Sequence, residues 1–338
     1  MSLTYTRFGR RQALGLLAAT AAAPLIAGCQ GTGQPEADAS AGPDTAGFPV
    51  TIEHARGSTT IPAPPTKIIT VGFTDHEFFL ALGVRPIGVR AWFGEDIDHT
   101  WPWIKPAWGD TKVTYIGSQE LDYEQIATLA PDVIVGLYAE LEQDVYDRLS
   151  AIAPTVAEDP DSAPYTTDRA IMFRNAAKIL GKGPDADKML ADIDQRFATV
   201  REQNAGFAGQ TAAVVDPGQK TFYAFSKTDP RGRFLADLGF AEPTELNKVI
   251  GDQFGAEISP ERIDLLDLDR LLLLADAETR TWLAANKIYQ AMNVVKDKRT
   301  LEIPYYETPF AGAAMAYNTP LSVPYALDNL VPQLATTP

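Results

Sequence analysis

Few residues of this sequence have the types and spacing that metal or nucleophile chemistry requires. The histidines His54, His76 and His99 lie at no metal-ligand spacing, and Cys29 is the only cysteine, so no internal disulfide can form. No G-x-S-x-G elbow, H-E-x-x-H pair or phosphate-binding loop occurs. We therefore expect no catalytic residue, no metal ligand and no cofactor, and enzymatic activity is the weaker alternative.

Aromatic residues indicate a different chemistry, the burial of a large flat ligand. Four of the five tryptophans fall in one segment that has little periodic core pattern, namely Trp92, Trp101, Trp103 and Trp108. Such rings cover a large, partly apolar molecule well. The alternative is that these tryptophans fill one end of a sheet.

The elements that would position these side chains alternate between strands and helices. Apolar, β-rich runs at 67–73, 86–92 and 132–138 alternate with helical patterns, and the second half repeats this order around 212–215 and 270–275. The alternation predicts an α/β protein with mainly parallel sheets. In such sheets, ligands bind beyond the carboxyl ends of the strands. This rule gives the candidate ligand-binding residues His76, Trp92, Trp101, Trp103, Tyr138, Tyr223, Arg231 and Tyr306.

Two of these candidates are polar and have alternatives. Arg231 follows Pro230 in a loop, where a guanidinium could reach an anionic or carbonyl-rich ligand, or be an ordinary surface charge. We expect Arg233 to begin the next helix. His76 either faces the ligand or lies near solvent at the start of a helix.

The longest helical pattern runs from about Pro184 to Asn204. Its apolar residues recur at steps of three and four, Pro184 is suited to the first turn, and Arg201 lies near the end, where the helix dipole favours a cation. A helix of this length spans roughly 30 Å, about the diameter of a small domain. We interpret it as a connection between two lobes rather than a crossover helix within one domain.

An internal repeat supports two related lobes. Glu124 and Asp132 are separated by eight positions, as are Glu261 and Asp269, and in both segments Ile follows Glu by two positions and Leu by five. The alternative is that any helix followed by a buried strand shows this pattern.

Several segments, taken in order, resemble bacterial iron–siderophore binding lipoproteins, a family related to haem- and cobalamin-binding proteins. The first-lobe segments are IPAPPTKIITVGF, LALGVRPIGV, LDYEQIATLAPDVIVG and LSAIAPTV, and the second-lobe segments are PRGRFLADLGF, EISPERIDLLDLD, AMNVVKDKRTLEIP and YALDNLVPQL. The resemblance covers roughly residues 49 to 335. It implies two Rossmann-like lobes joined by one long helix, with the ligand cleft between them and an arginine in that cleft.

The resemblance also implies partners and a division of the chain. The ligand would be a ferric siderophore, or haem held by His76, Tyr138 or Tyr306, delivered by a monomeric protein to the permease dimer of an ABC importer. Glu124 and Glu261 match the family's acidic residues that dock on the permease, although both could simply favour a helix start. The lobes are expected at 49–165 and 207–338, with inter-lobe helices at 166–206.

The N-terminus predicts export. Arg10 and Arg11 precede an apolar run that ends at Cys29, a pattern typical of a twin-arginine signal peptide over residues 1–28. Cys29 resembles a lipobox cysteine, which would be lipidated and anchor the protein outside the cytoplasmic membrane. Residues 29–48 have the composition of a flexible tether. The formal charge of −15 argues against a nucleic-acid partner, and the enzyme alternative would be extracytoplasmic.

Overall fold

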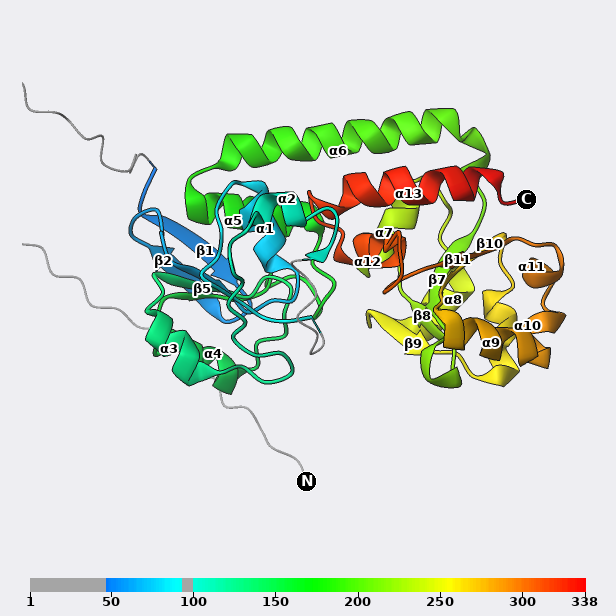
Figure 1. Cartoon of the computed structure of the whole chain (residues 1–338), viewed down its shortest axis with the longest axis horizontal. Coiled ribbons are helices and arrows are strands. Elements are labelled where there is room, and N and C mark those ends of the chain that lie inside the picture. The colour runs from blue at the N-terminus through cyan, green and yellow to red at the C-terminus, as the bar shows by residue number, and fades with distance from the viewer. Residues whose placement is uncertain (1–46, 93–99) are drawn as a thin grey trace, which may run out of the picture. The chain divides into compact units, whose positions relative to one another are not determined.

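The computed structural model describes residues 47–92 and 100–338. Within them the chain forms two α/β lobes, as the alternation of strands and helices predicts, and a long helix connects the lobes (Figure 1). The expected signal sequence, Cys29 and nearly all of the expected tether lie outside the described residues.

The first lobe contains a two-stranded hairpin and a four-stranded parallel sheet. The hairpin pairs β1 with β2 in antiparallel register, and the sheet has the order β4-β3-β5-β6. Its strands are β1 (Val50–His54), β2 (Gly57–Ile61), β3 (Ile68–Thr70), β4 (Gly88–Val89), β5 (Val133–Val135) and β6 (Thr155–Val156), and its helices are α1 (Asp75–Ala81), α2 (Lys105–Trp108), α3 (Tyr123–Leu129) and α4 (Gln143–Ser150).

The second lobe contains a five-stranded mixed sheet of order β11-β10-β7-β8-β9. Strands β7, β10 and β11 pair in parallel, whereas β8 pairs antiparallel with both β7 and β9, a departure that the sequence alternation does not reveal. The strands are β7 (Ala212–Asp216), β8 (Tyr223–Phe225), β9 (Gly255–Glu257), β10 (Arg270–Leu274) and β11 (Thr300–Ile303). The helices are α7 (Pro230–Asp237), α8 (Thr244–Ile250), α9 (Ala277–Ala285), α10 (Lys287–Ala291), α11 (Asn293–Lys296) and α12 (Ala311–Tyr317), with short 3-10 segments η2 (Ala205–Phe207), η3 (Gly218–Lys220) and η4 (Pro260–Leu266).

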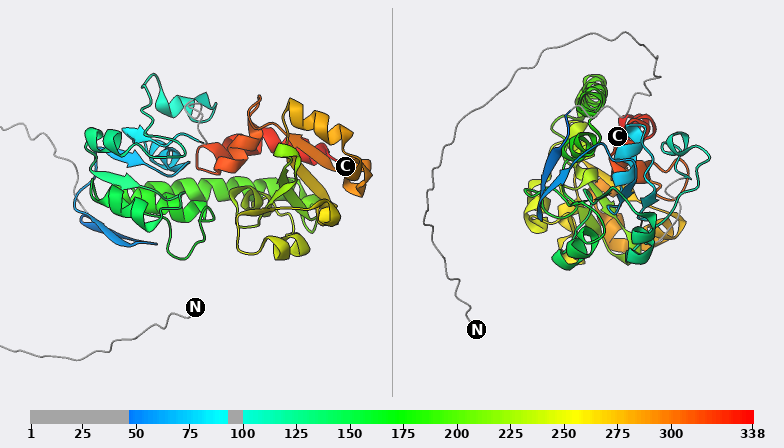
Figure 2. Two further views of the ribbon diagram at one scale, coloured as in Figure 1. Left: turned by 90° about the horizontal axis from the view of Figure 1, so that it is seen from below. Right: turned by 90° about the vertical axis from the view of Figure 1, so that its left-hand side faces the viewer.

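The predicted connecting helix is α6 (Gly183–Gln203), which follows α5 (Arg169–Leu180) and runs past both lobes (Figures 1 and 2). Lys182 Nζ, just before it, donates to the Leu82 carbonyl of the first lobe at 2.7 Å. Near its other end, Arg201 donates to the Asp237 carbonyl of the second lobe. The C-terminal helix α13 (Ser322–Thr336) packs beside it. Because each end is tied to a different lobe, α6 sets the spacing of the lobes.

The internal sequence repeat corresponds to a repeated structure. In the first lobe, Asp132 Oδ2 accepts hydrogen bonds from Thr66 N and Oγ1 at 2.8 and 2.9 Å. In the second lobe, Asp269 Oδ2 accepts from Thr211 N and Oγ1, both at 2.8 Å. Each aspartate thus ties its strand to the chain entering the neighbouring parallel strand. The helical turns of Glu124 and Glu261 therefore occupy equivalent places in the two lobes.

One helix begins earlier than expected. Helix α7 starts at Pro230, so Arg231 lies in its first turn, whereas the sequence suggested a loop here and a start at Arg233. The reason is the Asp229 carboxylate, which accepts from Arg231 N at 2.8 Å and caps the helix. The backbone of Arg231 is therefore held in the first turn of α7 and does not belong to a loop.

Candidate functional site

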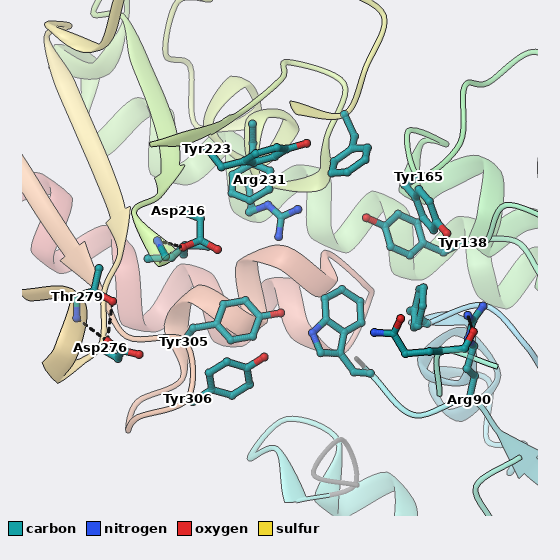
Figure 3. Close-up of a pocket in the computed structure, with 17 residues that line it drawn as sticks. Arg90, Tyr138, Tyr165, Asp216, Tyr223, Arg231, Asp276, Thr279, Tyr305 and Tyr306 are labelled. Atoms are coloured by element: carbon teal, nitrogen blue, oxygen red, sulfur yellow. Dashed lines mark hydrogen bonds between the residues drawn. The ribbon is translucent and has the colours of Figure 1, made fainter. Parts of the chain in front are cut away.

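A cavity of about 640 Å³ lies between the two sheets, at their carboxyl-terminal edges (Figure 3). This volume lies within the usual range for small-molecule sites. Its first-lobe walls come from the loops after β3, β4, β5 and β6, and its second-lobe walls from the ends of β7, β8, β10 and β11. The cavity thus lies where the strand-end rule predicts a ligand.

Aromatic rings make up about half of the lining and continue from one lobe to the other. Tyr138 packs edge-on against Tyr165 at 5.6 Å between ring centroids, and Tyr165 packs against Phe254 of the second lobe at 5.9 Å. Phe254 in turn contacts Tyr223. The lining rings are Phe73, Trp92, Tyr138, Tyr165, Tyr223, Phe225, Phe254, Tyr305 and Tyr306. Such a surface suits a large, partly apolar ligand.

Arg231 lies in the cavity wall and is held by its neighbour. Its Nε and Nη2 atoms donate to the two carboxylate oxygens of Asp229 at 2.8 and 2.7 Å, and its guanidinium stacks 3.6 Å from the Phe225 ring centroid. Burial alone would lower the pKa of this guanidinium, but the Asp229 carboxylate outweighs burial and raises it. Nη1 donates no hydrogen bond within the described chain, so it is available to a ligand.

Arg90 forms the cationic part of the opposite wall and is not among the ligand-binding residues predicted from the sequence. Its Nε and Nη2 donate to the backbone carbonyls of Ser118 and Gln119 at 2.6 and 3.1 Å, and its guanidinium lies 4.1 Å from the Phe73 ring centroid. Burial lowers its pKa from a value so high that the group stays charged. The sequence carried a signal for Arg90, because it lies near the end of the apolar run at 86–92, directly after the observed strand β4.

Asp75 holds the first-lobe loops in place. It is fully buried, and its carboxylate accepts from Leu137 N at 2.7 Å and Tyr138 N at 2.8 Å. A Cβ atom on Gly72 would come within 2.2 Å of this carboxylate, so only glycine fits there. Asp75 thereby fixes the backbone that carries Tyr138 into the cavity.

The burial of Asp75 predicts a pH-dependent stability. Desolvation raises the pKa of this carboxyl to about 7, above its ordinary value of 3.8. The folded protein binds this proton more tightly than the unfolded chain, so protonated Asp75 adds to the free energy of unfolding at acidic pH. This stabilisation is lost as pH rises toward 7, by about 1.4 kcal/mol per unit of pKa difference. The free energy of unfolding, measured in urea, should therefore be lower at pH 8 than at pH 5 in wild type, and the difference should be smaller in Asp75→Asn. An equal pH dependence in both proteins would contradict this assignment.

Five of the eight predicted ligand-binding residues line the cavity, namely Trp92, Tyr138, Tyr223, Arg231 and Tyr306. The other three lie elsewhere. His76 is completely buried in α1, where burial lowers its pKa to about 3 and its ring stacks on Trp108. Trp101 stacks on Trp103 at 5.2 Å, and both pack among the side chains of Phe310 and Tyr317 from the second lobe. They lie in the contact between the lobes, whereas the alternative interpretation placed the tryptophans at one end of a sheet.

Glu77 supplies the hydrogen-bond partner for the buried indole nitrogen of Trp103. Its carboxylate is fully buried and accepts from Trp103 Nε1 at 2.8 Å and from Thr319 Oγ1 of the second lobe. This direct link fixes α1 against the loop before α13. The pattern H-E-F-F gives no sign of it, because a helix-start glutamate is ordinarily exposed.

Two further predicted residues lie outside the cavity. Glu124 is exposed in the first turn of α3, and Glu261 is exposed in the first turn of η4. Hydrogen bonds from its own backbone and from Ser259 lower the pKa of Glu261, so it is charged at neutral pH. Both side chains lie at the surface. In the described part of the chain, no group of three His, Cys, Asp or Glu side chains is placed to hold a metal ion.

The relatives found by comparison with known proteins are binding proteins. The "Probable siderophore-binding lipoprotein YfiY" of Bacillus subtilis (strain 168) is 31% identical over 298 residues, covering 83% of this chain and 86% of the relative. The crystal structure of a periplasmic solute binding protein from Mycobacterium smegmatis has a TM-score of 0.74 and 29% identity, covering 85% and 98% of the two chains. Streptococcus pneumoniae TIGR4 PiaA in complex with ferrichrome has a TM-score of 0.72 and 26% identity, with the same coverage. Residues 68–306 match the family model described as periplasmic binding protein, and the chain therefore belongs to the periplasmic binding protein family.

Proposed function

We propose that this protein captures a ferric siderophore outside the cytoplasmic membrane and delivers it to an ABC importer for iron uptake. The observation that carries the proposal is the aromatic cavity between the lobes, whose size and polarity suit an iron chelate. The names of YfiY and of the PiaA complex, which report a siderophore and ferrichrome, support this ligand class. The tie of α6 to both lobes favours a cavity that is formed before the ligand arrives.

A chelate fits the cavity better than a bare ferric ion. The lining supplies two arginines, two aspartates and several phenols, and no group of three His, Cys, Asp or Glu side chains is placed to hold a metal ion in the residues that the structure describes. A siderophore already fills the coordination sphere of its iron and presents mainly its organic surface. The rings of both lobes would bury that surface, and Tyr138 and Arg231 would bond its oxygens.

A fluorescence titration with ferrichrome, ferrioxamine B, ferric citrate and haem tests this proposal. Binding beside Trp92 should quench tryptophan emission without a Soret band, and Trp92→Ala should weaken affinity by about 1–3 kcal/mol. Trp108→Phe is the matched control, because Trp108 is buried outside the lining. Quenching by haem with a Soret band would favour the haem alternative, with a phenol of Tyr138 or Tyr306 as the nearby axial ligand. No binding of any iron chelate would overturn the proposal.

We further propose that Glu124 and Glu261 dock the loaded protein on a permease dimer. The two residues occupy equivalent positions in the two lobes, because the Asp132–Thr66 and Asp269–Thr211 links follow them in the same order. A pair of exposed carboxylates arranged in this way suits a two-fold partner with basic residues.

The double variant Glu124→Ala, Glu261→Ala tests the docking role. Neither residue lines the cavity, so siderophore affinity should match wild type, while siderophore-dependent uptake of iron by cells should fall at least severalfold. Glu120→Ala with Glu245→Ala removes the same charge from exposed sites and serves as the control. Normal uptake by the first double variant would exclude these residues from docking.

We also propose that residues 1–28 are a twin-arginine signal peptide and that lipid on Cys29 anchors the mature protein through the tether at 29–48. We propose lobes at 49–165 and 207–338 with inter-lobe helices at 166–206, and the order of sheets and helices supports this division. No helix in the described ranges is long and apolar enough to span a bilayer. Metabolic labelling with palmitate should mark wild type but not Cys29→Ala, and labelling of both would contradict the anchor.

A further inference from the structure

The second-lobe wall of the cavity carries two carboxylates. Asp216 ends β7, and Asp276 follows β10 and caps helix α9. Figure 3 shows both on the side of Tyr305 and Tyr306, away from Arg90. The same strand-end geometry that gathers the aromatic rings therefore also gathers negative charge.

Neither carboxylate forms an ion pair within the described residues, and Arg280, the basic side chain that acts on Asp276, is itself paired with Glu302 and Glu307. Asp216 Oδ1 accepts from Gly218 N at 2.7 Å, and Asp276 Oδ1 accepts from Thr279 N and Oγ1 at 2.8 and 2.6 Å. These donors belong to the same turns, and no Lys, Arg or His of the described chain forms an ion pair with either aspartate. The hydrogen bonds from Thr279 lower the pKa of Asp276, which is therefore ionised at neutral pH.

The cations of the lining do not offset these charges locally. Arg231 is already paired with Asp229, and Arg90 lies on the first-lobe wall over Phe73. Two arginines against two lining aspartates and Asp229 leave the site with a formal charge of −1. An anionic chelate would therefore face uncompensated carboxylates on one wall, whereas a cationic group would find partners there.

The classes of siderophore differ in the net charge of their ferric complexes. Three hydroxamates neutralise Fe(III), three catecholates leave an excess of negative charge, and a free amine on the ligand adds one positive charge at neutral pH. One buried hydroxyl indicates where the chelate itself would bind. Tyr138 is only 4% exposed and lines the cavity, and its hydroxyl has no hydrogen-bond partner among the described residues. Its hydroxyl can bond a hydroxamate oxygen while an amine reaches the other wall.

On the basis of the proposed function, we infer that the preferred ligand is a ferric hydroxamate siderophore that carries a protonated amine, held by Asp216 and Asp276. The iron centre would lie among the aromatic rings and near Tyr138. The ammonium would replace its water shell with the two carboxylates. These aspartates are then the residues that select the ligand by charge.

Ferrioxamine B and its N-acetyl derivative test the inference, because they differ only in the charge and bulk of the terminal amine. Wild type should bind ferrioxamine B at least about tenfold more tightly, since a charge-assisted bond of this kind is worth a factor of ten or more. Asp216→Asn with Asp276→Asn should lose this preference and keep its affinity for the acetylated form. Asn retains the capping hydrogen bond at 276, and Glu278→Gln, an exposed acid on the same helix outside the lining, is the control.

The outcomes separate this inference from the proposed function. Equal affinity of wild type for both forms, or tighter binding of a ferric catecholate, would overturn the amine assignment and leave siderophore capture intact. Failure of every ferric chelate to bind would overturn both. A preference that survives in the double Asn variant would assign the selection to other residues.

Discussion

Replacing Arg231 with Met should lower the free energy of unfolding by about 3–5 kcal/mol, because it leaves the Asp229 carboxylate charged and unpaired in the interior. Asp229 is fully buried, and its two oxygens accept from the Arg231 guanidinium. Met keeps most of the side-chain volume, so the loss reports on charge rather than on a cavity. The measurement is the midpoint and slope of urea unfolding, followed by fluorescence and circular dichroism.

A second change checks the cause. Adding Asp229→Asn to Arg231→Met should restore part of the stability, since a neutral amide still caps α7 but leaves no buried charge. Arg174→Met is the matched control: it breaks an exposed pair with Asp187 and should cost at most about 1 kcal/mol. If Arg231→Met costs no more than this control, the pair does not hold the cavity wall.

Phe197→Ala should destabilise the protein by a similar amount, about 3–5 kcal/mol, because it opens a cavity where α6 packs on the second lobe. The ring is 2% exposed and meets Phe234 of α7 edge-on, with 5.5 Å between centroids. The Arg169 guanidinium lies 5.6 Å from the same ring, so α5 shares the contact. Urea unfolding measures the loss.

Gln195→Ala on the exposed side of α6 is the control and should change stability by less than about 0.5 kcal/mol. Comparable values for Phe197→Ala and Gln195→Ala would show that α6 is not held to the second lobe by this face. The role of α6 in spacing the lobes would then need another explanation.

The connecting helix was predictable because its signals are local. Pro184 at the start, Arg201 near the end and the three-and-four spacing of Ile193 and Phe197 all lie within one segment. Its predicted range of 184–204 differs from the observed Gly183–Gln203 by one residue at each end. The Glu–Asp repeat was equally local, and it located two segments that occupy the same place in each lobe.

The site was predictable only as far as the strand ends. Tyr138 and Tyr223 border strands whose sequence is plain, whereas Tyr165 and Phe254 come from irregular loops that carry no periodic signal. His76 and Trp101 also follow strands, yet long-range packing turns them into the interior, and the sequence does not encode that choice locally. The negative charge of the second-lobe wall was not predicted for the same reason, because Asp276 has the sequence pattern of an ordinary helix cap.

The iron position in a crystal of the protein with ferrioxamine B tests the central claim most directly. Anomalous scattering at the iron edge locates the metal without reference to the organic ligand. We predict one strong peak inside the cavity between the lobes, with rings from both lobes, such as Tyr138 and Tyr223, against the chelate. A peak on the outer surface, or contacts to one lobe alone, would contradict capture between the lobes.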